Sequence, residues 1–393
     1  MNFEQLKSLD QQSHTPNYGR YDLGLSHGKS STVYDVEEKQ YIDFTSGIGV
    51  NSLGFADDGW AEAVYHQAKT LQHTSNLYYN EATATLTSTL TKLTGMDKVF
   101  MCNSGAEANE CAIKLCRKYS FDKYGSDRYE IITLINSFHG RTMSTLTATG
   151  QDAMHPDCFA PFVGGFKYAV SGDFEDFKAK VTDKTCAVIM EMIQGEGGVL
   201  PQDKEFVKQV CEFAKQKDIL VVVDEVQTGI GRTGKLLAYE HYDITPDVIT
   251  LAKGLGGGLP IGACLCTEEL QNVLSAGSHG STFGGNPVAC AGASYVLSKV
   301  ANQEFLDEVA KKGEYIFSRL NKMKNVKSTR GLGMMIGIEV EGMTGAEVAK
   351  KCIENGLIVL TAKALVRLLP PLNITYDEID KGLAIFENVI KGE

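Results

Sequence analysis

A single lysine interrupts a strongly apolar stretch of the chain. Lys253 follows the run from Val248 to Ala252 and precedes four glycines between positions 254 and 258. An amine held in apolar surroundings has a lowered pKa and can act as a nucleophile. Taken alone, a lysine here would more often extend its amine to solvent. The glycines favour a reactive lysine, because they remove side-chain bulk and leave room for a flat ligand and an entering substrate.

Two acids end a second apolar run, ILVVV, at Asp224 and Glu225. Open α/β sheets bind ligands at the carboxyl ends of their strands, so these acids are placed for chemistry. A carboxylate in such a position can keep a pyridinium nitrogen protonated and turn the ring into an electron sink. A helix cap is one alternative. A metal site shared with histidines such as His139 is another, but no convincing ligand spacing accompanies it.

The stretch NSGAEANECAIKLCR, which begins at Asn103, places small residues directly before a helical pattern. The first N–H groups of a helix lack backbone partners and lie at its positive end, so they can bind a phosphate, and Ser104 can add its hydroxyl. By itself the stretch equally fits an ordinary helix cap. It matches neither the GxGxxG nor the Walker A pattern, so nucleotide binding of those kinds is not indicated.

A fourth stretch, SFHGRTMSTLTATG, runs from Ser137 to Gly150. Phe138 could offer an aromatic face to a planar ring, and Arg141 could clamp a carboxylate through two hydrogen bonds. Taken separately, core packing explains the phenylalanine and a structural ion pair explains the arginine equally well. Together, the four stretches supply a phosphate cradle, a ring platform, a pyridinium partner and an amine nucleophile, which is the set that a pyridoxal-phosphate site requires.

Strands and helices that could position these residues alternate through the middle of the chain. Fully apolar strands between amphipathic helical patterns indicate βα units and a mostly parallel sheet covered on both faces. The expected strands lie at 98–103, 129–135, 185–193, 218–226 and 247–252.

The two flanks of the chain have a different pattern. Residues 31–44 alternate as in an antiparallel hairpin, a long helix is expected from Pro287 to Met323, and short strands follow. We therefore expect an α/β fold with two domains. A large domain (48–286) would surround the mostly parallel central sheet, and a smaller α+β domain would be built from both chain ends (1–47 and 287–393).

The composition of the chain restricts the binding partners and the cellular compartment that we expect for the protein. The chain has 393 residues and a formal net charge of −11, which argues against nucleic acid or an anionic membrane as its main partner. The first residues lack a signal-peptide pattern, and no run reaches the roughly 18 apolar residues of a membrane span. The ten cysteines form no CxxC pair, so we expect reduced core cysteines and a cytoplasmic protein.

Six motifs in a fixed order make the chain similar to the class III (subgroup II) pyridoxal-phosphate-dependent aminotransferases, in the acetylornithine/ornithine aminotransferase branch. The match runs from NYGRYDL at Asn17 to RLLPPLNIT at Arg367. It includes SGAEANE, FHGRT, QGEGG, DEVQTGIGRTG, AKGLGGGLPIGA and STFGGNP. The resemblance implies the fold type I architecture and pyridoxal 5'-phosphate as the cofactor.

The resemblance also implies roles around the cofactor ring. Lys253 would attach the cofactor covalently and then move the proton of the 1,3-prototropic shift as acid and base. Asp224 would pair with the ring nitrogen, and Gln227 would lie near the phenolic oxygen. Val226 and Phe138 would lie against the two faces of the ring.

The phosphate group would be bound where the SGAEANE motif begins. By resemblance, the residues that bind it are Ser104, Gly105 and Ala106, with Thr282 from the neighbouring subunit. That last contact implies a homodimer with its active sites at the interface.

Two arginines would bind the carboxylates of the substrates, and a glutamate would control access to one of them. By resemblance, Arg141 would hold the α-carboxylate of the amino donor and of 2-oxoglutarate. Glu196 would pair with Arg367 when no dicarboxylate is bound, and would swing away to free the arginine for a second carboxylate. Such an exchange lets one site accept both an ω-amino donor and a dicarboxylate acceptor.

The motifs indicate the identity of the amino donor less directly than they indicate the cofactor. Tyr18 would lie near its α-amino end or its acyl group. Ornithine aminotransferases carry a tyrosine where SGIGVN places Ile48, and an apolar side chain better tolerates an acylated amino group. The resemblance therefore favours transfer of the δ-amino group of N2-acetylornithine to 2-oxoglutarate, giving N-acetylglutamate 5-semialdehyde and glutamate in arginine biosynthesis. Ornithine, succinylornithine, 4-aminobutyrate and N-acetyl-lysine-type donors are alternatives, and succinyldiaminopimelate could be a second substrate.

One segment departs from the family pattern. At NSLGFADDGW, Phe55 and Asp57 replace the usual histidines of a GHxHP-like sequence, which leaves the local structure at the domain junction open. A non-catalytic protein of the same fold is a further alternative, but the presence of both Lys253 and Asp224 disfavours it.

Overall fold

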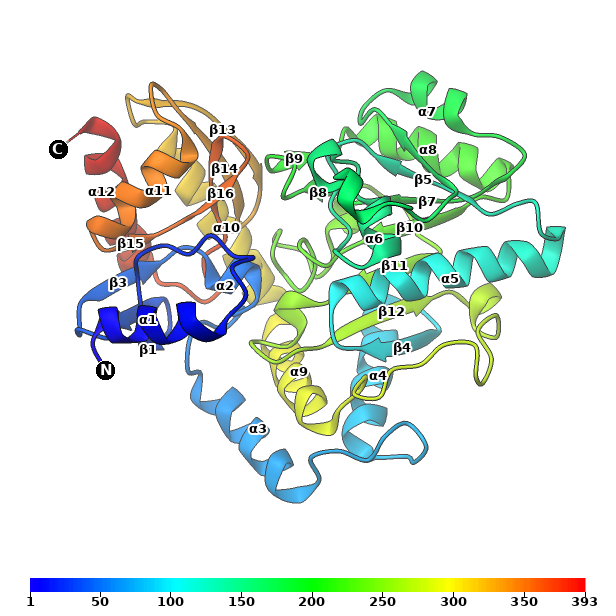
Figure 1. Cartoon of the computed structure of the whole chain (residues 1–393), viewed down its shortest axis with the longest axis horizontal. Coiled ribbons are helices and arrows are strands. Elements are labelled where there is room, and N and C mark those ends of the chain that lie inside the picture. The colour runs from blue at the N-terminus through cyan, green and yellow to red at the C-terminus, as the bar shows by residue number, and fades with distance from the viewer. Residues whose placement is uncertain (393) are drawn as a thin grey trace.

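A seven-stranded sheet forms the middle of the larger part of the protein in the computed structural model, which describes residues 1–392 (Figure 1). Neighbouring strands are parallel except at β12, which runs antiparallel to both β4 and β11, so the mostly parallel sheet is confirmed. In order across the sheet, the strands are β4 (Lys98–Cys102), β12 (Gly262–Cys266), β11 (Val248–Leu251), β10 (Leu220–Asp224), β7 (Thr185–Met190), β5 (Glu130–Leu134) and β6 (Phe166–Ala169).

Helices cover both faces of this sheet. On one face, Val222 packs in a cluster with residues of α5 (Gly105–Tyr124). On the other face, Val221 and Val223 pack with residues of α7 (Phe174–Lys180) and α8 (Lys204–Gln216). Because both faces are buried, the central strands are apolar at most positions, which explains runs such as ILVVV that show no alternation.

The smaller part of the protein is built from the N-terminal and C-terminal segments of the chain, which lie on the same side of the molecule in Figure 1. Its first sheet contains β1 (Leu25–Lys29), β2 (Thr32–Asp35), β3 (Gln40–Asp43) and β15 (Leu357–Ile358). The antiparallel pairing of β2 with β3 confirms the expected hairpin, and β3 pairs in parallel with β15 near the other end of the chain. The division of the chain at residues 47 and 286 stays a prediction.

A second four-stranded sheet and three helices complete this part. They are β13 (Val326–Leu332), β14 (Met335–Val340), β17 (Leu365–Leu368) and β16 (Leu360–Ala362), with α10 (Gln303–Leu320), α11 (Gly345–Glu354) and α12 (Tyr376–Lys391). The shorter elements of the chain are α1 (Phe3–Ser13), α2 (Ser46–Gly49), α6 (Met143–Ala148), β8 (Ile193–Gln194), β9 (Leu200–Pro201), and the 3-10 turns η1 (Asp152–Met154), η2 (Asp157–Phe159), η3 (Ala238–His241), η4 (Lys253–Leu255) and η5 (Glu268–Leu270).

The single helix expected from Pro287 to Met323 is wrong, because two helices occupy this range. The first, α9 (Pro287–Val300), packs against α3 (Asp58–Thr70) and α4 (Glu81–Thr94). A new helix, α10, starts after Asn302, whose side-chain oxygen accepts a hydrogen bond from the N–H of Phe305 at 3.2 Å. Asparagine is strongly preferred at this capping position, since it satisfies an N–H that has no partner in the first turn.

The segment that lacks the family histidines has a structural role. Asp57 caps α3 by accepting a hydrogen bond from the N–H of Trp60 at 2.9 Å. Phe55 and Ser30 exchange two backbone hydrogen bonds of 2.7 and 2.9 Å. The indole of Trp60, the only tryptophan of the chain, donates to the carbonyl of Gly256 at 3.1 Å, so α3 contacts the glycine-rich loop after the lysine.

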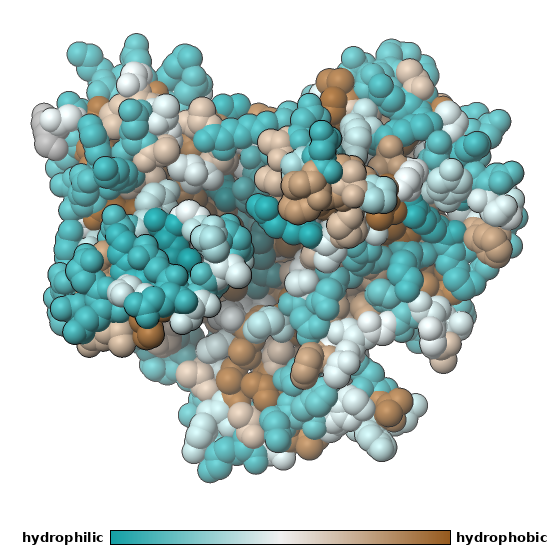
Figure 2. All heavy atoms as spheres, viewed as in Figure 1, coloured by the Kyte–Doolittle hydropathy of each residue, from teal (hydrophilic) through white to brown (hydrophobic). Residues whose placement is uncertain are grey.

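The cysteines are in the reduced state that the sequence predicts. All ten cysteines are unpaired, and all except Cys158 and Cys211 are buried. None of the helices within residues 1–392 combines the length and apolar character that crossing a lipid bilayer requires. Hydrophilic side chains dominate the face in Figure 2, which is hollowed between the two parts of the protein.

Candidate active site

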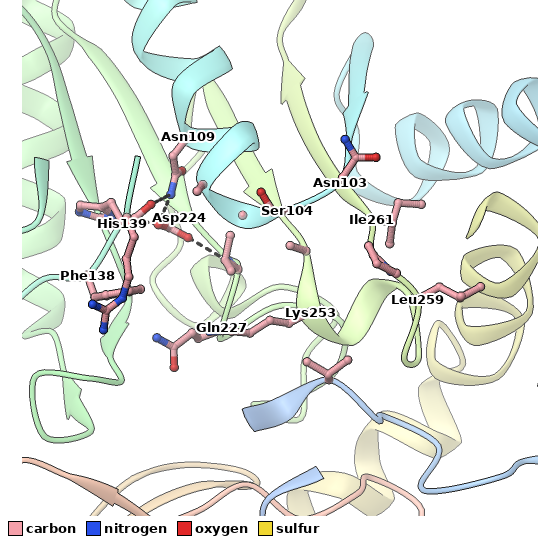
Figure 3. Close-up of a pocket in the computed structure, with 18 of the residues that line it drawn as sticks. Asn103, Ser104, Asn109, Phe138, His139, Asp224, Gln227, Lys253, Leu259 and Ile261 are labelled. Carbon is pink, nitrogen blue, oxygen red and sulfur yellow. Dashed lines mark hydrogen bonds and ion pairs between the residues drawn. The ribbon is translucent and has the colours of Figure 1, made fainter. Parts of the chain in front are cut away.

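A cavity of about 490 Å³ opens where β4, β10 and β11 end. In open α/β sheets this edge is the usual place for ligands. Nine of the residues predicted for the site line the cavity: Ser104, Gly105, Ala106, Phe138, Arg141, Asp224, Val226, Gln227 and Lys253. In Figure 3 the side chains of Lys253 and Gln227 extend into the same space.

Lys253 starts the turn η4 directly after β11. Its φ angle is 43°, a left-handed value that residues with a Cβ atom rarely adopt and that clusters at functional sites. Burial lowers the pKa of its amine to about 8; the nearby charge of Glu196 raises this pKa, and that of Arg367 lowers it. About a tenth of the amine is therefore neutral, and nucleophilic, at pH 7, far more than for a lysine with the ordinary pKa of 10.5.

Asp224 ends β10, the parallel neighbour of β11, and three hydrogen bonds fix its carboxylate (Figure 3). Its Oδ2 accepts from the side-chain amide of Asn109 at 2.7 Å and from Nδ1 of His139 at 2.8 Å. Its Oδ1 accepts from the N–H of Val226 at 3.0 Å. Asn109 is held in turn by the hydroxyl of Thr250, which donates to its Oδ1 at 2.8 Å. The carboxylate is thus oriented at the cavity wall before any ligand binds.

Asn109 and Glu191 were not predicted as site residues. Asn109 lies on the buried face of α5 among alanines and cysteines, and a polar residue on such a face is the signal that could have identified it. Glu191 comes directly after the apolar strand β7, and an acid at that position is a similar signal. Its carboxylate accepts a hydrogen bond from the N–H of Phe138 at 3.0 Å. Burial, followed by the nearby Asp224 carboxylate, raises the pKa of Glu191 well above its ordinary value.

The residues considered for a metal site are engaged in other contacts. His139 binds Asp224, whereas Glu225 accepts hydrogen bonds from the hydroxyl of Thr228 and from the N–H of Tyr239 at 2.8 Å. Within residues 1–392, no three histidine, cysteine or acidic side chains are grouped so that they could hold a metal ion.

The start of α5 forms another part of the cavity wall. Ser104 caps this helix, and its hydroxyl accepts from the N–H of Glu107 at 3.2 Å. Gly105 packs so closely on Val226 that a Cβ atom at position 105 would lie 2.6 Å from a methyl carbon of the valine. Glycine is therefore required here, and its backbone lies at the cavity with no side chain to cover it.

Arg367 reaches the site from β17, in the smaller part of the protein. Its Nη1 donates to Oε1 of Glu196 at 2.9 Å and to Oε1 of Gln227 at 3.2 Å. The ion pair that the resemblance implies is thus present, although the movement of Glu196 stays a prediction. Arg141 lines the cavity, with its guanidinium 5.7 Å from the centre of the Phe138 ring.

Besides Glu196 and Arg367, which form the ion pair described above, three predicted residues do not line the cavity. Tyr18 is 65% exposed and lies in a separate groove beside α1, next to His14 and Arg20. Thr282 lies on an exposed loop. Ile48, in α2, is 45% exposed and lies two residues before Val50, which does line the cavity. The roles predicted for these three stay predictions.

The residues at this edge fit pyridoxal phosphate. Gly105 leaves the backbone of a helix start open to a phosphate, Asp224 presents a fixed carboxylate, and Lys253 offers an amine of lowered pKa. When bound, the cofactor supplies an aldehyde that takes up amino groups and a protonated ring that withdraws electrons. The fold and the site together define a pyridoxal-phosphate-dependent enzyme of fold type I.

Comparison with known proteins gives the family. The model of the family "Aminotransferase class-III" matches residues 15–390. The acetylornithine aminotransferase of Haemophilus ducreyi is 48% identical over 392 residues, which is 99% of each chain. Among solved structures, the ornithine aminotransferase of Toxoplasma gondii has a TM-score of 0.95 at 30% identity, covering 100% of this chain and 96% of that one. The N-acetylornithine aminotransferase of Stenotrophomonas maltophilia has a TM-score of 0.84 at 34% identity over 98% of each chain.

The chain belongs to the class-III aminotransferase family. It is a pyridoxal-phosphate-dependent aminotransferase.

Proposed function

We propose that the chain transfers the δ-amino group of N2-acetylornithine to 2-oxoglutarate, giving N-acetylglutamate 5-semialdehyde and glutamate, as a step of arginine biosynthesis. The observation that carries the proposal is the Glu196–Arg367 ion pair, whose two charges both act on the amine of Lys253. The proposal is supported by relatives such as the acetylornithine aminotransferase of Haemophilus ducreyi, which is 48% identical to this chain.

The ion pair suits two substrates of different charge. N2-acetylornithine has one carboxylate and 2-oxoglutarate has two. Arg141 and Arg367 provide one cation for each carboxylate of 2-oxoglutarate, so Glu196 must release Arg367 when the acceptor binds. When the donor binds, Glu196 neutralises Arg367, so no unpaired charge is left where the donor brings no second carboxylate.

Lys253 and Asp224 perform the chemistry that both half-reactions share. Because its pKa is about 8, the Nζ of Lys253 can take up and release a proton near neutral pH, as the exchange of an amino group for an oxo group requires. Asp224, whose carboxylate is held by Asn109 and His139, would pair with the ring nitrogen of the bound cofactor. Neither role depends on which amino donor enters the cavity.

Ile48 is the residue that we expect to favour an acylated donor. It has no hydroxyl that could bind a free α-amino group, and an uncharged acetyl group tolerates an apolar neighbour at lower cost than an ammonium group does.

The proposed donor is tested by comparing kcat/KM for N2-acetylornithine, ornithine, succinylornithine and 4-aminobutyrate at a fixed concentration of 2-oxoglutarate. Rejection of a charged group from an apolar contact is worth about 2 kcal/mol or more, so we expect N2-acetylornithine to exceed ornithine by at least about 30-fold. An equal or larger value for ornithine would assign the chain to ornithine δ-transamination instead. Succinyldiaminopimelate belongs in the same series as a second substrate.

We also propose a homodimer in which Thr282 contributes to the phosphate site of the neighbouring subunit. Large side chains are exposed at Leu77, Tyr78 and Tyr79, and Phe283 is exposed directly after Thr282. Exposed apolar side chains that gather in this way mark interaction surfaces. Sedimentation velocity should show a dimer that Tyr79→Arg weakens. A wild-type monomer that is fully active would exclude a shared site.

A cytoplasmic location is the last part of the proposal. Ten unpaired cysteines, most of them buried, are typical of proteins from a reducing compartment. Fractionation of the native cells should therefore recover the activity with cytoplasmic markers.

A further inference from the structure

The four residues of α2 form a left-handed helical turn beside the cavity. Ser46, Gly47, Ile48 and Gly49 have φ angles of 43°, 63°, 66° and 74°, and the N–H of Gly49 donates to the carbonyl of Thr45 at 2.9 Å. Residues with a Cβ atom rarely adopt this conformation, and for a β-branched residue such as Ile48 it is an outlier. Such a turn persists only where the surrounding structure holds it, which is most common at functional sites.

Asp43 holds the start of the turn. Its carboxylate accepts hydrogen bonds from the N–H of Thr45 at 2.8 Å, from the hydroxyl of Thr45 at 2.5 Å and from the N–H of Ser46 at 2.9 Å. Ser46 donates its hydroxyl to the carbonyl of Leu369 at 2.6 Å. All of these residues are buried, so the turn is fixed to the segment that follows β17.

Arg232 joins both segments to the larger part of the protein. Its Nη1 donates to the carbonyls of Pro370 at 2.5 Å and Met334 at 3.2 Å, and its Nη2 donates to the hydroxyl of Ser46 at 3.4 Å. Burial lowers the pKa of Arg232 to about 9, while the Asp43 carboxylate acts in the opposite direction. Burial also raises the pKa of Asp43 to about 6. Both groups are therefore charged near neutral pH, and the attraction between them is retained in the protein interior.

The two segments that Arg232 connects carry two of the residues that we expect to contact the substrates. Ile48 lies within the turn, and Arg367 lies two residues before Leu369. The residues expected around the cofactor lie elsewhere, on α5 and at the ends of β5, β10 and β11. Arg232 can thus fix the position of Ile48 and Arg367 without itself lining the cavity.

We propose that Arg232 is a positioning residue for substrate binding. By holding the Ser46–Gly49 turn against the Leu369–Pro370 segment, it places Arg367 to receive a carboxylate of the dicarboxylate acceptor. This inference rests on the proposed function, because it takes 2-oxoglutarate as the acceptor. An arginine that only stabilised the fold would lower the melting temperature and leave the affinity of the folded enzyme for a dicarboxylate unchanged.

The test uses Arg232→Lys and Arg232→Met in the holoenzyme and a ligand that does not react. Glutarate, a dicarboxylate without an oxo group, is titrated by calorimetry, and the Michaelis constant for the oxo-acid acceptor, the cofactor affinity and the melting temperature are measured beside it. Because the charge-assisted hydrogen bonds from an arginine to a carboxylate require close geometry, we expect Arg232→Met, which would displace Arg367, to raise the Kd of glutarate at least about ten-fold. Arg232→Lys should lie between, since an ammonium group keeps the charge but cannot span several carbonyls.

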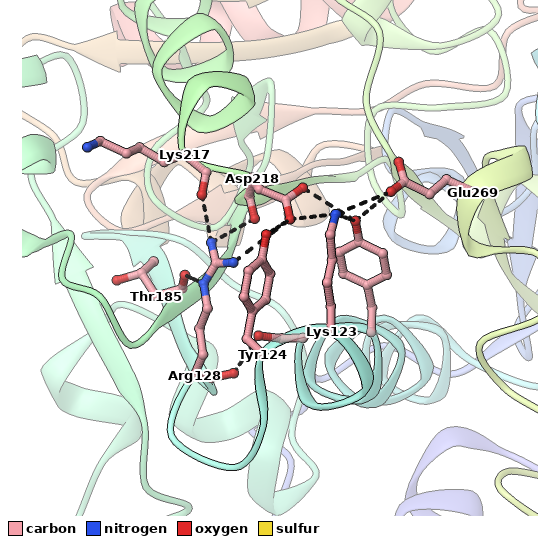
Figure 4. A network of polar contacts seen from close by, with 9 residues as sticks. Lys123, Tyr124, Arg128, Thr185, Lys217, Asp218 and Glu269 are labelled. Carbon is pink, nitrogen blue, oxygen red and sulfur yellow. Dashed lines mark hydrogen bonds and ion pairs between the residues drawn. The ribbon is translucent and has the colours of Figure 1, made fainter.

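Arg128, shown in Figure 4, provides a matched control, because it precedes the start of β5 and so lies at the edge of the sheet opposite to the one where the cavity opens. It too binds backbone carbonyls, with Nε donating to Thr185 at 2.8 Å and Nη2 donating to Lys217 and Asp218 at 2.7 Å each. Arg128→Met should lower the melting temperature and leave the Kd of glutarate within about two-fold of the wild-type value, as expected for a distant and independent site.

Three outcomes decide the proposal. If glutarate binding changes no more in the Arg232 variants than in Arg128→Met, the proposal is wrong. If Arg232→Met does not fold, Ser46→Ala, which removes the hydroxyl between Arg232 and Leu369, replaces it, and an unchanged glutarate affinity there overturns the proposal. Glutarate binding does not depend on the donor, so an enzyme that rejects N2-acetylornithine but shows the expected glutarate effect refutes the proposed function and supports the role of Arg232.

Discussion

Replacing Lys253 by methionine should stabilise the cofactor-free protein at neutral pH. The pKa of the amine falls from its ordinary 10.5 to about 8 in the folded chain. At 1.36 kcal/mol per pKa unit, this difference means that folding with a charged Lys253 costs about 3 kcal/mol. Methionine has a similar length and no charge, so Lys253→Met removes that cost and should raise the free energy of unfolding by about 3 kcal/mol at pH 7.

The stability difference between the wild-type protein and Lys253→Met should become smaller as the pH rises. Below pH 8 the amine is protonated in both the folded and the unfolded chain, so the full cost is present. Between pH 8 and 10.5 only the unfolded chain keeps the proton, and the stability of the wild-type protein therefore rises with pH. The advantage of Lys253→Met should fall to about 1 kcal/mol near pH 9.5.

Urea denaturation of both cofactor-free proteins from pH 7 to 9.5 measures this difference. Lys184→Met, at an exposed lysine, is the control and should change stability by no more than about 0.5 kcal/mol at any pH. Glu196→Gln removes a charge that raises the pKa of Lys253, so the pH range in which stability rises should begin lower in that variant. Equal stability of wild type and Lys253→Met at pH 7, or a difference that does not vary with pH, would refute a lowered pKa at this amine.

Substitutions at three further positions, in the cavity wall or beside it, give separate predictions. Gly105→Ala places a Cβ atom 2.6 Å from Val226, and overpacking of about 1–3 kcal/mol should weaken pyridoxal phosphate binding about ten-fold in an absorbance titration; a Val226→Ala background should restore the affinity. Ile48→Gly should be more stable to urea than Ile48→Ala by about 1 kcal/mol, because only glycine adopts the left-handed conformation without penalty. His139→Leu removes a hydrogen bond to a carboxylate and should lower the free energy of unfolding by about 2 kcal/mol, but by clearly less when Asp224 is already asparagine.

The strands that position the site could be predicted because burial on both faces leaves a strong signal in the sequence. Residues 218–226 and 247–252 are apolar runs, and both end in residues that the structure brings to one edge of the sheet. The strands β6 and β12 were missed, since Lys167 interrupts the first and the second starts with glycine inside a run of small residues. The end of α9 was missed for a similar reason, because the helical pattern continues across Asn302.

The hydrogen-bond partners of Asp224 could not be predicted from spacing. Asn109, His139 and Thr250 come from three elements, and their meeting depends on how α5 packs across β10 and β11. The left-handed conformation of Ile48 is a second example. Two glycines beside it indicate a turn, but the turn is held by hydrogen bonds of Ser46 to Asp43 and to the distant Leu369 and Arg232, which local sequence does not reveal.

The bond from Trp60 to Gly256 gives the enzyme a fluorescent reporter of its own. The chain has one tryptophan, and its indole donates to the loop that follows the cofactor lysine, so all of the tryptophan emission comes from this position. Pyridoxal phosphate absorbs light in the range that tryptophan emits, and energy transfer over such a short separation should quench the signal. Loading of the cofactor, its release, and any motion of the glycine-rich loop during turnover could then be followed in real time on the unlabelled protein.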